Sequence, residues 1–346
     1  MKLDLGHPAW RTSLPPTRLV AAEAPVAACA FSRDGTGIGF ALGDGQVRLL
    51  PDDKTVDAHS GAVLSLVADP VGDGFASGGD DGRLLRIAAD GSIAELASQK
   101  GKWIDHLAIH RATGALAAGV GKNILVVTKV GETREFGPHH STVADLDFSK
   151  DGSRVAGAHY GGVTVWSLGQ TRPDQAALPP RRLAWTGSHI ALRWSTDGKF
   201  IATGTQENDI HVWRIAQATD MRMQGYPAKV KSLSWSASAR WLYTSAQPVF
   251  TAWSFAGSGP EGKPPLQFGE EGAGLMTVVA AHPTLEFVAG GYDTGELQLG
   301  DIKSKRTVVV KMADKSAITC LAWSPDGTAL AAGNERGDLL TIDLRR

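Results

Sequence analysis

Three histidines are the residues of this chain whose type and spacing best suit a chemical role. His139 and His140 are adjacent, and His159 follows one short segment later. Imidazole nitrogens are common zinc ligands, so three of them brought together would suit zinc or a similar metal. A metal-binding or metal-handling module built on His139, His140 and His159 is therefore one candidate function, with zinc as the candidate cofactor.

Signatures of catalysis are absent from the sequence. It contains no G-x-S-x-G, no Walker A loop and no H-E-x-x-H. The Gly-rich run at 78–82 reads as a turn between strands, so no helix N-terminus would face a phosphate there. Paired acids such as Asp80-Asp81 fit turn chemistry, in which Asp bonds to its own backbone. We therefore predict that the protein is not an enzyme.

Composition excludes several other classes. The chain has 346 residues, a net charge of −1 and only two cysteines. This balance argues against general nucleic-acid binding and against attraction to an anionic membrane. The N-terminal residues lack the apolar segment of a signal peptide, and no run of about 18 apolar residues predicts a membrane span. These features favour a cytoplasmic, reducing setting.

The elements that must position the histidines come from an internal repeat. A short apolar run, a turn such as S-x-D-G, a small apolar run ending in Gly, a second turn and an alternating strand recur along the chain. The segments 26–50, 143–168 and 318–344 show this pattern clearly. The last apolar residue before the first turn recurs roughly every 42 residues, within the period of four-stranded propeller blades. We take as these anchors Phe31, Ala68, Ile109, Phe148, Trp194, Trp235, Ala281 and Trp323.

The repeats predict strands that cannot stand alone. Runs such as VRLL, VTVW and LLTI are rich in β-formers, bounded by Gly, Asp and Asn, and too short for helices. A ring of such units buries both faces of each sheet and removes most exposed edges. We predict an all-β fold with one closed β-propeller of eight four-stranded blades over residues 1–346. A seven-bladed ring with one degenerate repeat is the alternative.

Individual motifs resemble the WD-repeat family, as a divergent member of bacterial type. The turn Ser324-Pro325-Asp326-Gly327 matches the S-P-D-G of that family, and tryptophans stand at its third-strand position at Trp166, Trp213 and Trp253. The literal Trp-Asp pair is missing. The resemblance implies a hydrogen-bonded set of His, Ser or Thr, Asp and Trp in a blade. It is most complete at His59, Ser77 and Asp81, with Arg86 at the Trp position, and is partly kept by His139 and Trp166. A place in such a set is the structural alternative to a metal for the blade-four histidines.

The two ends of the repeat array suggest how the ring closes. The last repeat stops after its third strand, so we expect the segment Thr17–Ala22 to supply the fourth. Cys29 and Cys320 would then lie on neighbouring blades. Two buried thiols are the main expectation, and a closing disulfide is the alternative.

The resemblance implies a scaffold that binds other proteins or peptides on one face, as a monomeric platform within a complex. Loops entering each blade and second inner turns should share that face. Exposed Trp, Tyr and Arg are frequent interface anchors. The aromatic, basic and polar residues in these loops are the predicted contact residues, namely Lys102, Trp103, Tyr160, Trp185, Gln206, Tyr226, Lys229, Tyr292 and Arg336.

Overall fold

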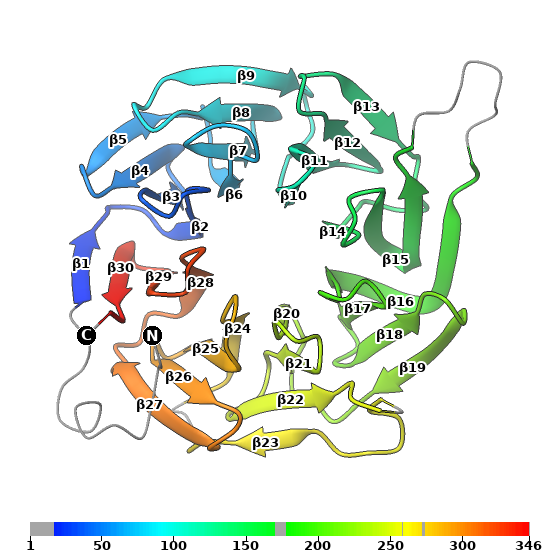
Figure 1. Cartoon of the computed structure of the whole chain (residues 1–346). Helices are drawn as coiled ribbons and strands as arrows, with labels where there is room; N and C mark the ends of the chain where they lie inside the picture. The colour runs from blue at the N-terminus through cyan, green and yellow to red at the C-terminus, as the bar shows by residue number, and fades with distance from the viewer. Residues whose placement is uncertain (1–16, 170–177, 258, 272–273, 346) are drawn as a thin grey trace.

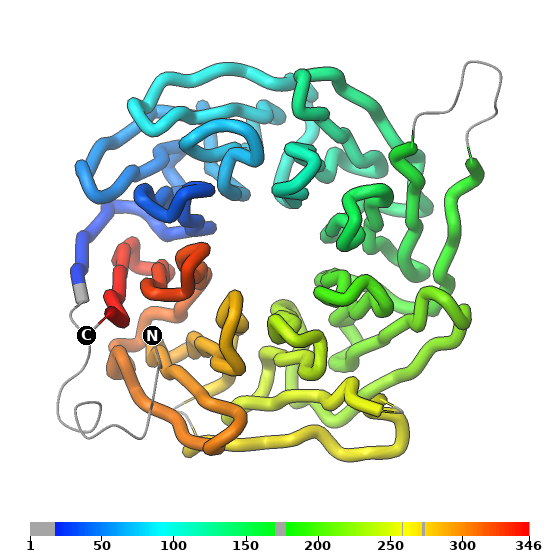
Figure 2. Tube along the Cα trace, in the orientation of Figure 1, coloured from blue at the N-terminus to red at the C-terminus, as the bar shows by residue number. Residues whose placement is uncertain are grey.

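The computed structural model describes residues 17–169, 178–257, 259–271 and 274–345. These residues form a ring of β-sheets (Figures 1 and 2). The strands β2, β6, β10, β14, β20, β24 and β28 lie nearest the axis of the ring. The described residues contain no helix, so no helix among them is long and apolar enough to cross a membrane. The prediction of an all-β propeller is confirmed.

Three four-stranded sheets open the ring and two more follow later, each with its strands in chain order. The β2–β5 sheet contains β2 (Val26–Phe31), β3 (Ile38–Leu42), β4 (Gln46–Leu50) and β5 (Lys54–Asp57). The β6–β9 sheet contains β6 (Val63–Ala68), β7 (Phe75–Gly79), β8 (Arg83–Ile87) and β9 (Ile93–Ser98). The β10–β13 sheet contains β10 (Leu107–His110), β11 (Ala115–Val120), β12 (Asn123–Val127) and β13 (Thr133–Phe136). The later two contain β20 (Leu233–Trp235), β21 (Trp241–Thr244), β22 (Phe250–Ser254) and β23 (Leu266–Phe268), then β24 (Met276–Ala281), β25 (Phe287–Tyr292), β26 (Leu297–Asp301) and β27 (Arg306–Lys311).

The fourth and fifth repeats run into one six-stranded sheet. It contains β14 (Asp145–Phe148), β15 (Arg154–Ser167), β16 (Arg181–Trp194), β17 (Phe200–Thr205), β18 (Ile210–Arg214) and β19 (Thr219–Met223). The first part of β16 pairs with β15 and its last part pairs with β17, so β16 belongs to both repeats. The described strands therefore form seven sheets, and the prediction of eight separate four-stranded sheets is corrected.

No repeat has been lost in reaching seven sheets. The predicted anchors all lie on innermost strands. Seven of them end such a strand, and Ile109 lies one residue before the end of β10. The alternative of seven blades is thus right about the number of sheets but wrong about a degenerate repeat.

The N-terminal strand completes the last sheet. β1 (Thr17–Ala21) pairs antiparallel with β30 (Asp338–Asp343), with Thr17 opposite Ile342, and the sheet continues through β29 (Ala329–Asn334) to β28 (Ile318–Trp323). This confirms the predicted partner of the N-terminal segment.

The first and last repeats pack against each other across this junction. Thr319 Oγ1 on β28 donates to the Val26 carbonyl on β2 at 2.6 Å. Cys29 and Cys320 share the apolar cluster there, and both are free and buried, as the main expectation had it. A hydrogen bond with the Cys320 thiol, together with burial, raises the pKa of Cys29.

The S-x-D-G phrase folds into the same turn wherever it occurs. In the turn after β14, Ser149 Oγ donates to Asp151 Oδ1 at 2.6 Å, and the same oxygen accepts from the Ser153 N–H at 3.1 Å. Gly152 then takes a φ of 68°, a left-handed conformation that favours glycine. The turn reverses the chain between β14 and β15 and so fixes where β15 begins.

Candidate functional site

The loops that contain the predicted contact residues lie at one end of the ring. Because the strands of each sheet are antiparallel, the turn between its second and third strands lies at the same end as the connection to the next sheet. We call this end the connecting face. Eight of the nine predicted contact residues lie in these turns and connections, or where the long strands β15 and β16 pass through the same level. The ninth, Tyr292, ends β25 beside such a turn.

Six of the nine predicted contact residues are exposed: Lys102, Trp103, Tyr160, Gln206, Lys229 and Arg336. Trp103 and Tyr160 keep 65% and 52% of their surface, large values for aromatic side chains. Two of the others already have partners within the chain. Lys229 Nζ reaches Gln206 Oε1 at 3.5 Å, and Arg336 donates to the Asp314 carbonyl at 2.8 Å.

The other three predicted contact residues are not freely exposed. Tyr226 is buried, its hydroxyl accepting from Trp253 Nε1 at 2.6 Å and meeting Thr244 Oγ1 at 2.9 Å. Burial raises the pKa of Tyr226 to about 12. Tyr292 is fully buried and donates to the Pro248 carbonyl at 3.2 Å. Trp185 is half-buried and stacks on His211, with ring centroids 3.9 Å apart. Tyr226 and Tyr292 are core residues, and their prediction as contact residues is corrected.

A continuous exposed strip crosses from the β10–β13 sheet to the six-stranded sheet. Lys102 extends over Gly121, where a Cβ would lie 3.6 Å from Lys102 Cδ. Lys122, next in the chain, donates to the His140 carbonyl at 3.4 Å. The His140 ring then stacks on Tyr160 with centroids 6.4 Å apart. This strip joins residues of both aromatic and basic character, and sequence reasoning missed Lys122.

The three predicted metal-binding histidines do converge. His139, His140 and His159 line one pocket of about 340 Å³ beside β15 and β16, together with Tyr160 and Arg182. The rings of His139 and His159 lie 5.6 Å apart. Gly162 makes this geometry possible, because a Cβ there would collide with the Leu183 carbonyl where β15 bulges against β16.

Hydrogen bonds occupy the ring nitrogens of the two buried histidines. His139 Nδ1 donates to the Lys122 carbonyl at 2.8 Å, and its Nε2 accepts from Trp166 Nε1 at 3.1 Å. His159 Nδ1 donates to the Tyr160 carbonyl at 2.8 Å, which leaves its Nε2 to accept from Thr164 Oγ1 at 2.8 Å. Neither histidine offers a lone pair to a metal, and the described residues contain no group of three potential ligands that could hold one. The zinc prediction is corrected for this reason.

Burial sets the charge of the same two histidines. Loss of solvent lowers the pKa of His139 to about 4, and it also lowers the pKa of His159. Both rings are therefore neutral at pH 7, as their hydrogen bonds require. The bond from Trp166 to His139 is the one that the resemblance implied for this repeat.

The polar set expected in the second repeat is also present. His59 Nε2 meets Ser77 Oγ at 2.9 Å, and His59 Nδ1 meets Asp81 Oδ1 at 2.9 Å. The Asp81 carboxylate also accepts from the Arg83 N–H at 3.0 Å. Arg86, at the Trp position, pairs instead with Asp69, with Nε and Oδ2 2.6 Å apart. The hydrogen-bonded set of His59, Ser77 and Asp81 is thus confirmed. Arg86, which replaces the Trp, lies outside it and pairs with Asp69.

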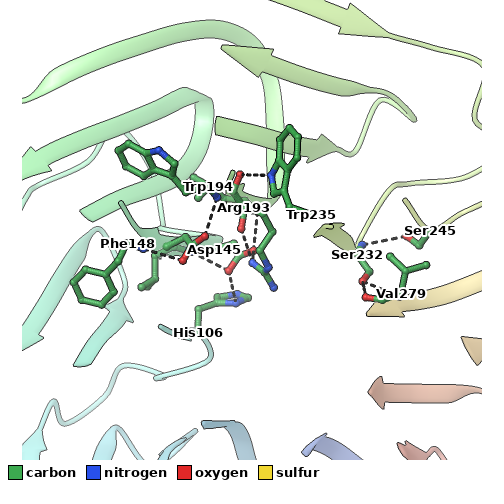
Figure 3. Close-up of polar contacts among 12 residues, drawn as sticks. His106, Asp145, Phe148, Arg193, Trp194, Ser232, Trp235, Ser245 and Val279 are labelled. Atoms are coloured by element: carbon green, nitrogen blue, oxygen red, sulfur yellow. Dashed lines mark hydrogen bonds and ion pairs between the residues drawn. The ribbon is translucent and has the colours of Figure 1, made fainter. Parts of the chain in front are cut away.

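Sequence reasoning also missed a polar cluster near the axis of the ring (Figure 3). Asp145 on β14 accepts from the Leu192 N–H and from Arg193 Nη1 on β16, both at 2.7 Å. Its other carboxylate oxygen lies 3.9 Å from His106 Nδ1. The contacts with Leu192 and Arg193 join the innermost strands of consecutive repeats. The signal in the sequence was the alternation of acids in DLDF (145–148), at positions where a strand this central usually carries small or apolar residues.

Serines make the same kind of bridge two repeats later. Ser232 Oγ accepts from the Val279 N–H at 3.1 Å, and Ser234 Oγ accepts from the Ala281 N–H at 2.9 Å. Asp147 accepts from the Trp194 N–H at 2.8 Å in the equivalent place. In both pairs the bridging residues are two apart, because alternate residues of a strand face the same side. The bridges tie the innermost strands of neighbouring repeats together at these two junctions.

Comparisons with known proteins agree with this architecture. The "WD domain, G-beta repeat" model matches residues 53–85, 131–167 and 182–214, and the "Anaphase-promoting complex subunit 4 WD40 domain" model matches residues 279–346. The crystal structure of the computationally designed Ika8 protein superposes with a TM-score of 0.73 at 19% identity, covering 93% of this chain and 97% of that one. A chain from a crystal structure of the Mitotic Checkpoint Complex gives a TM-score of 0.65 at 14% identity over 95% of this chain and 91% of its own length. At these identities the likeness concerns the fold alone.

Similar sequences occur in larger proteins. The "Chromatin assembly factor 1 subunit FAS2 homolog" of Oryza sativa subsp. japonica is 26% identical, over 56% of this chain and 36% of its own length. "Protein FIZZY-RELATED 3" of Arabidopsis thaliana is 23% identical, over 63% of this chain and 54% of its own length. The chain thus spans about a third to a half of these relatives, and the expected bacterial type gains no support from them. On its repeats, its fold and its family matches, the chain belongs to the WD-repeat family of β-propellers.

Proposed function

We propose that this chain is a non-enzymatic platform that binds protein segments on its connecting face, chiefly over the β10–β13 sheet and the first strands of the six-stranded sheet. The single observation that carries the proposal is the exposed strip from Trp103 and Lys102 through Lys122 and His140 to Tyr160. Aromatic side chains that stay exposed beside cations resemble the anchors of protein interfaces.

Two further observations support a binding role. Relatives bear names such as "Actin-interacting protein 1", from Caenorhabditis elegans, which is 26% identical over 42% of this chain. The Asp145 and Asp147 bridges tie β14 to β16 in the sheet that carries Tyr160, and a platform held in this way loses little conformational entropy on binding. A cytoplasmic location, a monomeric state and a single domain over residues 1–346 remain part of the proposal.

We also propose that the six-stranded sheet counts as two blades that share β16, which gives the platform eight repeats. The separate innermost strands β14 and β16, which end at the anchors Phe148 and Trp194, support this count. So does the long pairing of β15 with β16, in which β16 serves as the outer strand of one repeat before it becomes the inner strand of the next.

The test compares capture of a partner by three baits. Tagged wild-type protein, Trp103→Ala and Val130→Ala are each incubated with lysate of the native cell, and bound proteins are quantified by mass spectrometry. Val130 is the matched control, because it is 79% exposed but lies in the turn between β12 and β13, at the other end of the ring. We expect a protein enriched by wild type and by Val130→Ala to fall at least tenfold with Trp103→Ala. Equal capture by all three baits, or no enrichment over an unrelated bait, would contradict the proposal.

A further inference from the structure

The pocket beside β15 and β16 has an unbalanced charge. The described residues that line it include one arginine, three histidines and a tyrosine but no Asp or Glu. Pro138, Pro180 and Trp166 complete its apolar walls. This lining favours a ligand with an anionic group over one with a cation, since no carboxylate among the described lining residues could neutralise a positive charge.

The polar groups around the pocket fall into two kinds. His139 and His159 are buried, and their ring nitrogens form hydrogen bonds within the chain. They therefore shape the wall of the pocket and are not available to bind a ligand. The side chains of Arg182, His140 and Tyr160 are exposed, and none of the three has a hydrogen-bond or ion-pair partner among the described residues. Three side chains able to donate hydrogen bonds therefore line one cavity without partners in the part of the chain that the structure describes.

The register between β15 and β16 places Arg182 at the pocket. Arg182 on β16 lies directly opposite Thr164 on β15, so their side chains project from the same face of the sheet. Thr164 Oγ1 holds His159 in place. The neighbouring Arg181 faces the other way and donates to the Ile215 carbonyl at 2.7 Å. One of two consecutive arginines thus stabilises the fold, and the other remains at the pocket.

We propose that this pocket binds an anionic side chain of a partner segment, a carboxylate or a phosphoryl group, with Arg182 as the charged contact and His140 and Tyr160 as further donors. Guanidinium groups bind both anions through paired hydrogen bonds. The inference rests on the proposed function and adds the chemistry of the partner. The partner is an acidic segment that lies along the exposed strip and places one acidic side chain in the pocket. Lys122, in the middle of that strip, extends the attraction beyond the pocket.

The probes are three fluorescein-labelled twelve-residue peptides of alternating residues: Glu-Ala, phosphoserine-Ala and Lys-Ala. Fluorescence anisotropy measures their binding to wild type, Arg182→Gln, Arg182→Glu and Arg240→Glu. Arg240 is the matched control, because it is exposed, lies in the turn before β21 at the other end of the ring and undergoes the same change of charge. Arg182 is exposed too, so the variants should fold, and their thermal midpoints will confirm this.

We expect at least one acidic peptide to bind wild type, the Lys-Ala peptide not to bind, and affinity to fall with added salt. Arg182→Glu should weaken acidic binding at least tenfold, Arg182→Gln should weaken it less, and Arg240→Glu should change it less than twofold. Preference between the two acidic peptides separates a carboxylate site from a phosphoryl site. Equal losses in Arg182→Glu and Arg240→Glu, or no binding of either acidic peptide, would overturn the inference. If Trp103→Ala still abolishes capture of the cellular partner in that case, the platform stands without the anionic pocket.

Discussion

Removing the Asp145 carboxylate tests whether the bridges between innermost strands stabilise the ring. Asp145→Ala leaves the Leu192 N–H, on a fully buried residue, without its partner. A buried donor left unpaired costs about 1–3 kcal/mol. Arg193 also loses its ion pair, but 46% of its side chain is exposed, so water replaces that contact at a cost of at most about 1 kcal/mol. The free energy of unfolding should fall by about 1–4 kcal/mol in total.

A graded comparison separates the bridge from the charge. Asp145→Asn keeps a side-chain oxygen for the Leu192 N–H and loses only the charge, so it should cost about 1 kcal/mol. Urea unfolding followed by tryptophan fluorescence gives these free energies, and hydrogen exchange of the segment 189–196 reports the Leu192 amide directly. A local loss of about 2 kcal/mol predicts roughly 30-fold faster exchange in Asp145→Ala. Equal stability of the Asn and Ala variants, or unchanged exchange in this segment, would refute the bridge as the source of stability.

Two further predictions concern pH and the N-terminal strand. Burial raises the pKa of Asp147 to about 6, so its protonated form stabilises the folded state fully below pH 4, and this contribution, at most about 3 kcal/mol, is lost as the pH rises through 6. Asp147→Asn should therefore flatten the change in unfolding free energy between pH 4 and pH 7, and a slope equal to that of wild type would count against this assignment. Deleting residues 1–21 should lower the thermal midpoint and cause concentration-dependent light scattering, because it strips β1 from the edge of β30. Deleting only residues 1–16 is its control, and identical behaviour of the two truncations would show that β1 contributes nothing.

Most of the fold was predictable because each part of the repeat depends on a short segment of sequence. Each S-x-D-G turn predicts one reversal of the chain, and each short β-rich run predicts one strand. These predictions do not require knowledge of which residues pack against the segment in the folded protein. The pairing of the N-terminal segment followed from a repeat that lacked its last strand. The fusion of two repeats through β16 was not predictable, because residues 181–194 read equally well as two strands or one.

The candidate site was only partly predictable, since exposure depends on tertiary packing. Trp103 lies in the connection between β9 and β10, and Tyr292 ends β25. Both were predicted to lie on the same face, but the first is 65% exposed and the second fully buried. The histidines were correctly placed together, but the two ring nitrogens of His139 bond to Lys122 and Trp166, 17 and 27 residues away in the chain. Arg182 gave no signal of its own, because only its register opposite Thr164 distinguishes it from Arg181.

The pairing of β1 with β30 also sets the order in which the chain can fold. The two strands lie more than 300 residues apart, and closing a loop of that length costs about 5 kcal/mol of chain entropy beyond a fixed term. During synthesis β1 emerges first and waits on the order of tens of seconds for β30. The earlier sheets can form meanwhile from contacts between near neighbours, whereas the last sheet cannot. Completion of the ring is therefore a late event, and until it occurs the chain carries two unpaired strand edges that a chaperone would have to protect.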